Sequence, residues 1–339
     1  MARSLPHIAL LAIDNCYASS LYGLMDTLQI ANAHIRNKFG EEAPQYTWEV
    51  VSTRKSAING AGGIKLAADR SIRDGGHFDI IFVPAVYYAG SRDFEVWLEQ
   101  QNSVCDWLKA QWQLGAVLVS NCTSTFLLAE TGLLDLRAAT TTWWLEKQFR
   151  QRYPRPRLSV KELITEEDNL ICTGAISSYL YLGIYLLEKY SSPEIASLCA
   201  KAMLIDPGHR LQTPHQNLMD TPMSSDPAVS KAQYWLQTRL ENRIDMSELA
   251  SYLNLSQRTL IRKFKRELGL PPATYLQNIR METAKQLLES TRLPISEIAE
   301  KVGYANIGSF SRLFQDRIGL TPNRYRQRFS MRGINEQTS

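Results

Sequence analysis

Three arginines near the C-terminal end recur at every fourth position, namely Arg258, Arg262 and Arg266. Apolar residues recur with the same spacing two positions out of phase, namely Leu260, Phe264 and Leu268. On an α-helix this pattern predicts one basic face and one buried face. Such a helix fits the major groove of DNA, where arginine pairs with guanine and its charge attracts phosphate. A solvated basic face is the alternative interpretation.

The same pattern occurs a second time. Leu249, Ala250 and Leu253 recur as Ile298, Ala299 and Val302 at an offset of 49. From the next helix onward the offset is 50, and it relates Leu260, Phe264, Gly269, Leu270, Pro272 and Tyr275 to Phe310, Phe314, Gly319, Leu320, Pro322 and Tyr325. The one-residue slip falls in a turn. Two helix–turn–helix units in register, joined by a long helix at about 272–290, favour DNA binding over a solvated face.

Capping signals mark where these helices begin. Asp245 with Glu248 predicts an N-cap and capping box, and 254–256 predicts a tight turn into the next helix. In the second copy the outer row is Gly308, Arg312 and Asp316, so its basic face is weaker. The residues that we expect to contact DNA are Ser256, Gln257, Arg258, Thr259, Arg262, Lys263, Asn306, Ser309 and Arg312.

Cys122 is a candidate for a different chemistry. It ends the strand-like run 116–122 and opens a helix-like one. A thiol at a helix N-terminus has a lowered pKa and can act as a nucleophile. The alternative is a buried, inert thiol. His209 and His215 flank a proline-rich stretch without nearby cysteines or paired carboxylates, so we assign no metal site.

The elements that must position Cys122 alternate in type. Strands are expected at 7–13, 46–52, 78–85 and 116–122, with helices at 18–36 and 93–113. Then follow a short helix ending at 130, a helix at 143–153, strand-like runs at 157–164 and 169–174, and two helices within 177–205. This alternation predicts an α/β domain with a largely parallel, flavodoxin-like sheet and helices on both faces. Beyond residue 227 the period is helical throughout, which predicts an all-α domain.

Composition and charge support two domains. The 339 residues exceed one hydrophobic core, and 44% hydrophobic with 21% charged residues is ordinary for a globular protein. From Ala228 onward the chain has 18 Lys and Arg against 10 Asp and Glu, whereas residues 1–227 carry a net charge of −4. Residues 206–227 contain four prolines. We therefore expect a sensor domain at 1–205, a linker at 206–227, a DNA-binding domain at 228–329 and a tail at 330–339.

The cysteines and the N-terminus bear on location. The five cysteines include no CxxC pair, which suggests neither a disulfide framework nor a zinc ribbon. The apolar run at 7–13 is too short for a signal-peptide core or a membrane span. We therefore expect a protein of the cytoplasm that binds no membrane.

The C-terminal part resembles the AraC/XylS DNA-binding domain across residues 228–329, through essentially every apolar position. The resemblance implies two recognition helices, 256–268 and 306–318, that enter successive major grooves on one side of the duplex. It also implies a regulator that often activates, with RNA polymerase as a partner. Repeated DNA sites are compatible with a homodimer.

The residues around Cys122 resemble the PfpI/ThiJ branch of the class-I glutamine-amidotransferase-like superfamily over about 7–190, as in GlxA-type regulators. There Cys122 matches the nucleophile-elbow cysteine. Thr142 stands where such domains often carry the histidine base, and Ser20 stands where relatives have an acidic residue. A cysteine without base or acid is a poor catalyst. We therefore interpret the domain as a retired enzyme scaffold that requires no cofactor.

Ligands of open α/β sheets bind beyond the carboxyl ends of the strands. The candidate ligand-pocket residues are Asp14, Asn15, Tyr87, Asn121, Cys122, Thr123 and Trp143, with Ala85 and Val86 beside them. The resemblance implies a small nitrogenous effector such as an amino acid, a betaine or carnitine. The function expected is thus a sequence-specific, effector-controlled transcription regulator. The alternative is a cysteine-dependent hydrolase or amidotransferase with an accessory DNA-binding tail.

Overall fold

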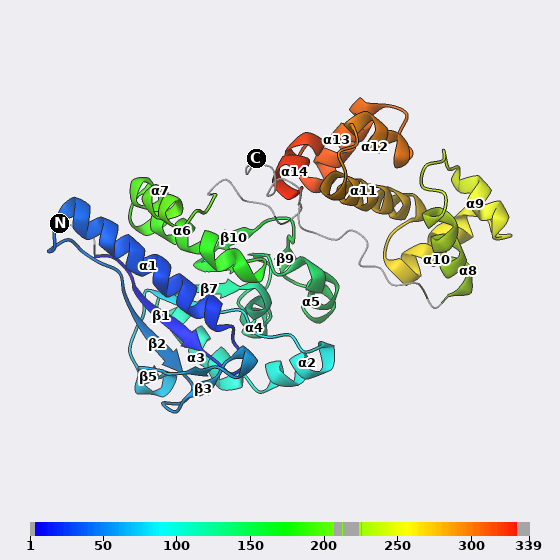
Figure 1. Ribbon diagram of the computed structural model, residues 1–339. Helices are drawn as coiled ribbons and strands as arrows, with labels where there is room; N and C mark the ends of the chain where they lie inside the picture. The colour runs from blue at the N-terminus through cyan, green and yellow to red at the C-terminus, as the bar shows by residue number, and fades with distance from the viewer. Residues whose placement is uncertain (1–3, 207–211, 213–223, 225, 331–339) are drawn as a thin grey trace. The chain divides into compact units, whose positions relative to one another are not determined.

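The computed structural model describes residues 4–206, 212, 224 and 226–330 (Figure 1). The chain divides into two compact units, Met1–Gln212 and Thr213–Ser339. Most of the expected linker, including His209 and His215, lies outside the described residues. Within the described ranges, no helix combines the length and the apolar character needed to cross a membrane.

The N-terminal unit is built on a seven-stranded sheet with the order β10-β11-β7-β6-β1-β2-β5. Its strands are β1 (His7–Ala12), β2 (Thr47–Ser52), β5 (Arg70–Ser71), β6 (Ile80–Val83), β7 (Val117–Asn121), β10 (Ile164–Glu167) and β11 (Leu170–Thr173). Every neighbouring pair is parallel except β10 and β11. These two join through Asp168 and Asn169, both at positive φ, as a tight hairpin requires. The predicted α/β fold with a largely parallel sheet is confirmed.

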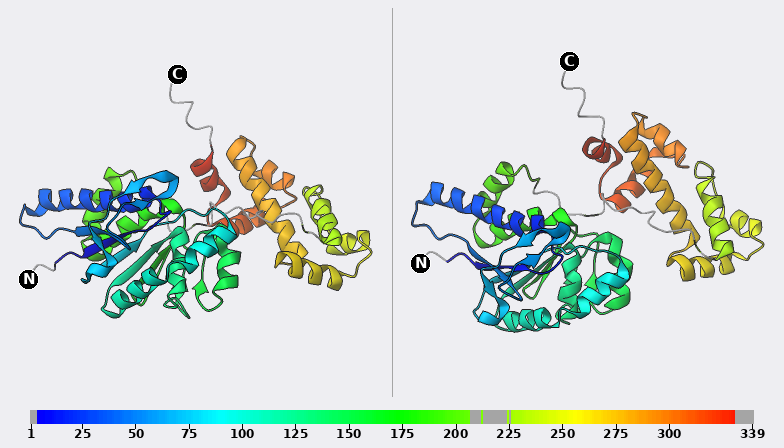
Figure 2. Two further views of the ribbon diagram at one scale, coloured as in Figure 1. Left: turned by 90° about the horizontal axis from the view of Figure 1, so that it is seen from below. Right: turned by 60° about the horizontal axis from the view of Figure 1, so that its bottom comes forward.

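Helices cover both faces of this sheet, which is why β6 and β7 are buried along their whole length. Figures 1 and 2 show one layer formed by α1 (Ala18–Phe39), α6 (Tyr179–Tyr190) and α7 (Pro193–Ala202). The other layer contains α2 (Ser91–Glu99), α3 (Asn102–Gln113) and α4 (Thr125–Glu130). Smaller elements are the hairpin of β3 (Ile58–Asn59) with β4 (Lys65–Leu66), the pair of β8 (Ala138–Ala139) with β9 (Arg157–Leu158), and α5 (Glu146–Arg152).

The single helix expected at 93–113 is wrong, because the chain forms α2 and α3 with a break between them. The Gln101 side chain donates to the Trp97 carbonyl over 2.9 Å, in place of the backbone N–H that would continue the helix. The Gln101 N–H turns instead to Leu98 O at 3.0 Å. A side chain that competes for a backbone acceptor thus ends α2.

The C-terminal unit is entirely helical in its described residues, as predicted. Its helices are α8 (Pro227–Gln237), α9 (Met246–Tyr252), α10 (Gln257–Leu268), α11 (Pro272–Ser290), α12 (Ile295–Lys301), α13 (Ile307–Ile318) and α14 (Pro322–Phe329). α10 and α13 both end at a glycine in the left-handed region, Gly269 and Gly319. The helices enclose two separate hydrophobic cores, one around Leu260 and Phe264 and one around Phe310 and Phe314.

Candidate nucleic-acid interface and elbow cysteine

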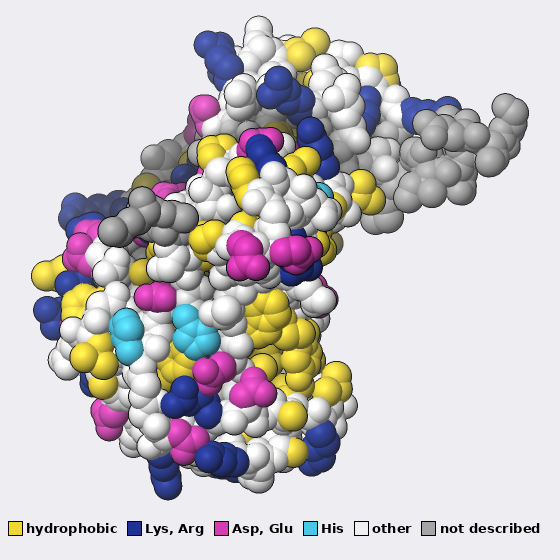
Figure 3. Space-filling view, turned by 90° about the vertical axis from the view of Figure 1, so that its left-hand side faces the viewer, with side chains coloured by type: hydrophobic (Ala, Val, Ile, Leu, Met, Phe, Trp, Pro, Cys, Tyr) yellow, Lys and Arg dark blue, Asp and Glu magenta, His cyan; other side chains and the backbone are white. Residues whose placement is uncertain are grey.

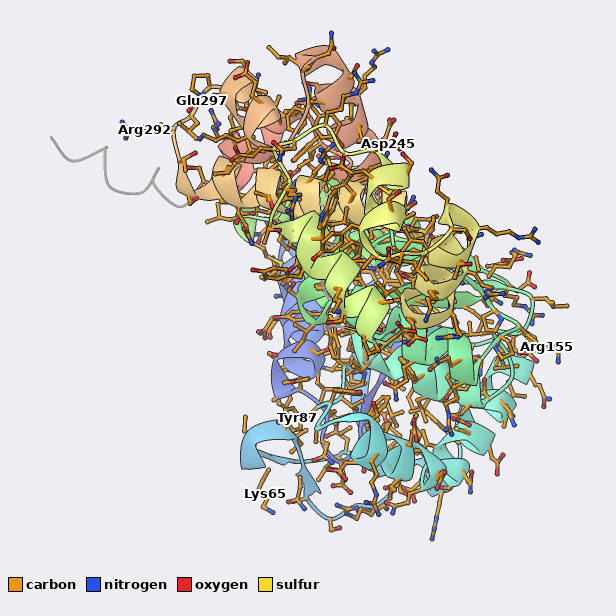
Figure 4. All side chains as sticks on the ribbon, turned by 90° about the vertical axis from the view of Figure 1, so that its right-hand side faces the viewer. Lys65, Tyr87, Arg155, Asp245, Arg292 and Glu297 are labelled. Carbon is orange, nitrogen blue, oxygen red and sulfur yellow. The ribbon has the colours of Figure 1, made fainter. Side chains whose placement is uncertain are left out.

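The first helix–turn–helix unit comprises α9 and α10, and each helix begins at a side-chain cap. Asp245 accepts from the Ser247 N–H at 2.9 Å, and Figure 4 shows it at the start of α9. This is a simple cap at the second helical residue, so the predicted capping box with Glu248 is not formed. Ser256 caps α10 by accepting from the Thr259 N–H at 3.2 Å. Its hydroxyl also donates to Thr259 Oγ1 at 2.9 Å.

The exposed side of α10 is a stripe of six residues, Gln257, Arg258, Ile261, Arg262, Lys265 and Arg266. We call this set the α10 stripe. It contains three exposed residues absent from the predicted set of DNA contacts, namely Ile261, Lys265 and Arg266. Ile261 lies four residues after Gln257, and Lys265 lies four residues after Ile261, so the helical spacing alone could have predicted that they share a face with Gln257. An apolar side chain beside arginines suits contact with a thymine methyl group next to a guanine.

Lys263 was expected to contact DNA, but it lies on the side of α10 that faces α8. Its Nζ is 2.6 Å from Asp226 Oδ2, and Arg266 Nη2 is 3.1 Å from the same oxygen. Asp226 also caps α8 through the N–H groups of Ala228 and Val229. The hydrogen bond from Lys263 is the largest cause of the lowered pKa of Asp226. The structure therefore places Lys263 in an internal ion pair rather than in the α10 stripe.

The second recognition helix, α13, is less basic on its exposed side. Asn306 caps it by accepting from the Ser309 N–H at 2.8 Å, so this amide oxygen is already engaged. The exposed residues at and after this cap are Asn306, Ile307, Gly308, Ser309, Arg312, Gln315 and Asp316. Arg312 occupies the position equivalent to Arg262, whereas Asp316 occupies that of Arg266. The first helix therefore offers more charge to phosphate than the second.

Cys122 forms a strained elbow between β7 and a short turn of 3-10 helix (Cys122–Ser124) that leads into α4. Its φ is 60°, a left-handed value uncommon for a residue with a β-carbon. The Thr141 hydroxyl donates to the Cys122 carbonyl at 2.9 Å. Thr123 Oγ1 donates to the Val86 carbonyl at 2.7 Å and accepts from the Val86 N–H at 2.9 Å. These bonds hold the elbow between two strand ends.

The thiol of Cys122 is buried, with 4% of the residue exposed. Burial raises its pKa to about 12, and the nearby hydroxyls of Thr123 and Thr142 offset this only in part. Thr142 Oγ1 lies close enough to favour the thiolate, but it forms no hydrogen bond of ordinary geometry among the described residues. The residue that stands in place of a histidine base is therefore beside the sulfur. It cannot take the thiol proton at neutral pH.

Ser20 and Asn121 form a buried network next to the elbow. The Ser20 hydroxyl donates to Asn121 Oδ1 at 2.7 Å. The Asn121 amide donates to Thr173 Oγ1 at 3.0 Å and Ser178 Oγ at 2.8 Å. The predicted pocket residue Asn121 is therefore engaged in joining β7, α1 and β11. Ser20 supplies a hydroxyl where a carboxylate would be needed to exchange a proton with the thiol.

Three further predicted pocket residues, Asp14, Asn15 and Tyr87, lie in the loops that follow β1 and β6. Asp14 is paired with Arg54 through two contacts of 2.8 and 2.9 Å; burial alone would raise its pKa, but Arg54 and the Asn59 N–H lower it. The backbone carbonyl of Asn15 accepts from the Tyr87 N–H at 2.8 Å and so links two strand-end loops. Figure 4 shows Tyr87 at the same end of the unit as Lys65 of the β3–β4 hairpin.

Tyr17 is the site residue that sequence reasoning missed. Its ring lies 6.3 Å from that of Tyr87 in an edge-to-face arrangement. Burial, followed by the charges of Cys122 and Tyr87, raises the pKa of Tyr17, which places both groups in its neighbourhood. Trp143 follows Thr142 and is half-buried against the core. Tyr17, Tyr87, Cys122, Thr123 and Thr142 therefore form the group of side chains that the fold gathers at this strand end.

Gln212, a residue of the expected linker, contacts the segment next to the Cys122 elbow. Gln212 is 2% exposed, and its Nε2 lies 3.1 Å from both Thr140 Oγ1 and the Thr141 carbonyl. A β-carbon on Gly174 would lie 2.1 Å from the Gln212 side chain, so only glycine leaves room for it. Thr141 in turn bonds the Cys122 carbonyl. Two hydrogen bonds thus connect Gln212 to the elbow.

Charged side chains of both signs alternate on the face of the N-terminal unit seen in Figure 3, with hydrophobic side chains between them. This unit presents no single-sign stripe like that of α10 on that face. Among the described residues, no group of three or more His, Cys, Asp or Glu side chains is placed to hold a metal ion.

Comparisons with known proteins follow the same division. Residues 249–328 match the helix-turn-helix domain family, and residues 25–181 match the DJ-1/PfpI family. The HTH-type transcriptional regulator GbdR of Pseudomonas aeruginosa is 24% identical over 327 residues, which cover 96% of this chain and 85% of that protein. The regulator CdhR of the same organism is 25% identical over 298 residues, covering 86% and 84%.

The N-terminal unit is also similar to a solved structure from Vibrio parahaemolyticus that is described as a transcriptional regulator protein. The match has a TM-score of 0.51 and 17% sequence identity, and it covers 59% of this chain and 100% of the Vibrio chain. At this identity the match supports the fold alone. Fold and family matches together define the class: a transcription regulator that joins an α/β domain to paired helix–turn–helix units. The chain belongs to the AraC family, among the regulators that carry an N-terminal DJ-1/PfpI domain, as its resemblances predicted.

Proposed function

We propose that the protein reads DNA with α10 and α13 and that a small molecule bound near Cys122 controls this reading. The observation that supports the first part is the α10 stripe, in which Arg258, Arg262 and Lys265 project from a capped helix. Arg312 is their counterpart on α13. The positive charge of each arginine attracts phosphate, and the paired N–H groups of its guanidinium can form two hydrogen bonds with guanine. On the same ground we propose that the protein acts in the cytoplasm.

We infer that the N-terminal unit senses rather than catalyses. A thiol with a pKa raised to about 12 is protonated at neutral pH, and the groups beside it, Thr142 and Thr123, are hydroxyls. The edge-to-face rings of Tyr17 and Tyr87 offer π faces and phenol groups to a ligand. Aromatic faces of this kind attract a substituted ammonium group. An amino acid, a betaine or a carnitine-like effector fits this chemistry.

We also propose activation through RNA polymerase, binding as a homodimer, and the domain limits 1–205, 206–227 and 228–329. α8 begins at Pro227 and is capped by Asp226, which supports a domain that begins close to that residue. The proposal for the linker rests on the sequence of 206–227. Limited proteolysis of the full chain tests it, since a first cut within 30–190 would contradict the boundary.

The second candidate function is a cysteine-dependent hydrolase or amidotransferase. Its support is the strained elbow, because φ of 60° at Cys122 is the geometry that projects a nucleophile from a strand end. The missing base and acid speak against it. Turnover of amide and ester substrates that disappears in Cys122→Ala would establish this function.

The proposed function is tested with the full chain and DNA from upstream of its own gene. Wild type should shift this DNA specifically, and glycine betaine, carnitine or individual amino acids should change the affinity or the reporter output. Cys122→Ala should still bind DNA and should alter only the effector concentration required. Arg262→Ala should weaken specific binding by about 1–3 kcal/mol if the side chain reads a base. Failure of all these ligands with DNA binding intact would reject the effector class alone.

A further inference from the structure

The two helix–turn–helix units have separate cores that meet at the middle of α11. Tyr275, Leu276 and Ile279 belong to the first core, whereas Met281, Ala284 and Leu288 belong to the second. The change from one core to the other occurs at residue 280. Because each core is closed by itself, burial of apolar surface alone leaves the relative orientation of the two units weakly determined.

Arg280 lies at this boundary and is 9% exposed. Its Nε donates to the Leu240 carbonyl at 3.1 Å, and its Nη2 donates to the Asn242 carbonyl at 2.6 Å. Both carbonyls belong to the α8–α9 loop of the first unit. The guanidinium also lies 5.3 Å from the ring centroid of Tyr304, in the α12–α13 turn of the second unit. One side chain therefore contacts both units from the helix that joins them.

The α9–α10 turn and the α12–α13 turn differ at one equivalent position, and the contact of Arg280 explains the difference. Asn254 and Gly303 are equivalent in the repeat, and both have positive φ, 53° and 78°. Asparagine is accepted in the first turn. In the second, a β-carbon would lie 2.3 Å from Arg280 Nη2 and 2.4 Å from the Leu240 carbonyl. The close approach of the two units thus accounts for glycine in this copy.

We propose that Arg280 is a positioning residue for DNA recognition: it fixes the orientation of α10 relative to α13 and so sets the spacing between the two half-sites. The inference rests on the proposed DNA-binding function. One additional base pair between half-sites moves the second site by about 3.4 Å and rotates it by roughly 35°. A rigid pair of helices rejects such a site, whereas a flexible pair accepts it.

The direct test measures the distance between α10 and α13 in the full chain without DNA. Nitroxide labels at Lys265→Cys and Gln315→Cys occupy equivalent exposed positions, and the five native cysteines are buried. Pulsed electron resonance should give one narrow distance distribution. Arg280→Met, which retains the volume without the two carbonyl bonds, should broaden it. Arg324→Met removes the same charge from an exposed site on α14 and should leave it unchanged.

A second pair of variants removes the contact without altering Arg280. Gly303→Ala and Gly269→Ala impose similar backbone strain, at φ of 78° and 75°, but only the first collides with a neighbour. Gly303→Ala should therefore broaden the distribution more than Gly269→Ala. If Arg280→Met reduces the helix content, Arg280→Lys, which keeps the charge and reaches one carbonyl, supplies the same comparison. The proposal would be overturned if the folded variants of either pair, Arg280→Met with Arg324→Met or Gly303→Ala with Gly269→Ala, gave distance distributions of equal width.

The functional consequence is measured with unlabelled protein and sites selected from a random DNA library. For the wild type, one inserted base pair should lower affinity about tenfold, comparable to a mismatched base pair. For Arg280→Met the loss should be below about threefold, with bound sites showing several spacings. A wild-type spacing preference in this variant would reject the role of Arg280. Absence of any selected sequence would reject the proposed function instead, while the distance measurement would still test the rigid contact.

Discussion

Asp226 restrains two cations of the first recognition helix, so its substitution should change DNA binding in a defined way. Lys263 and Arg266 both contact Asp226 Oδ2, and the Arg266 side chain is 64% exposed. Asp226→Asn retains a good capping residue for α8 but removes the carboxylate that Lys263 and Arg266 share, whereas Arg266 Nε keeps its contact with Glu267 Oε1 at 2.7 Å. Each cation that then reaches a phosphate should steepen the slope of log K against log salt by about 0.9. We expect a change of up to about 0.9 for Arg266, which still competes with Glu267 for its charge, and of up to roughly 1.8 if Lys263 also turns outward.

The measurement is fluorescence anisotropy with non-specific duplex DNA between 50 and 200 mM salt, where one phosphate contact corresponds to about a threefold difference in affinity. Asp245→Asn is the matched control, because Asp245 also caps a helix of this unit through a backbone N–H. Stability should fall by about 1 kcal/mol from the lost ion pairs. The folded pKa of Asp226 is lowered, so this stabilisation exists above its unfolded pKa and disappears as pH falls through the folded value. Equal salt slopes for the two variants would refute the reasoning.

Three further predictions concern the two sites. Arg262→Ala and Arg312→Ala should each relax sequence specificity at one half-site, and the loss of non-specific affinity should be larger for Arg262→Ala. Binding of each variant to matched and mismatched duplexes measures these two effects. An equal loss of affinity on all sequences would instead assign both arginine side chains to phosphate contacts. Cys122 should react with iodoacetamide far more slowly at pH 8 than an exposed thiol, since its pKa is raised to about 12; rapid alkylation in mass spectrometry would contradict the buried, protonated thiol. Gly174→Ala and Gln212→Ala should both change the effector response, because both remove Gln212 from Thr141; an unchanged dose–response in the two variants would show that this contact carries no signal.

The recognition helices were predictable because their signals are local. Leu260 and Phe264 fix the helix phase, and Ser256 and Asn306 are capping residues whose bonds involve the next three residues. The engagement of Lys263 was not predictable, since it depends on Asp226, 37 residues earlier in the chain. Side-chain pairing across helices requires the packing of α8 on α10, which no periodicity encodes.

The elbow shows the same division. A strand-like run followed by a helix-like one indicated Cys122, and Thr142 in place of histidine indicated the missing base. The burial of the thiol, the use of Asn121 as a structural amide and the ion pair of Asp14 with Arg54 arise only when distant segments meet. Tyr17 carries no motif of its own, and its role near Tyr87 becomes visible only through the loops that join β1 and β6 to their helices.

The central claim is that two unequal recognition helices read one DNA site. The most direct measurement is a hydroxyl-radical footprint of the full chain on a site selected from a random library. For each bound protomer we predict two protected segments about 10–10.5 base pairs apart on the same face of the duplex, with the segment assigned to α10 persisting to higher salt. Arg262→Ala should remove one segment first and Arg312→Ala the other. A single protected segment, or two that both variants weaken equally, would contradict the account.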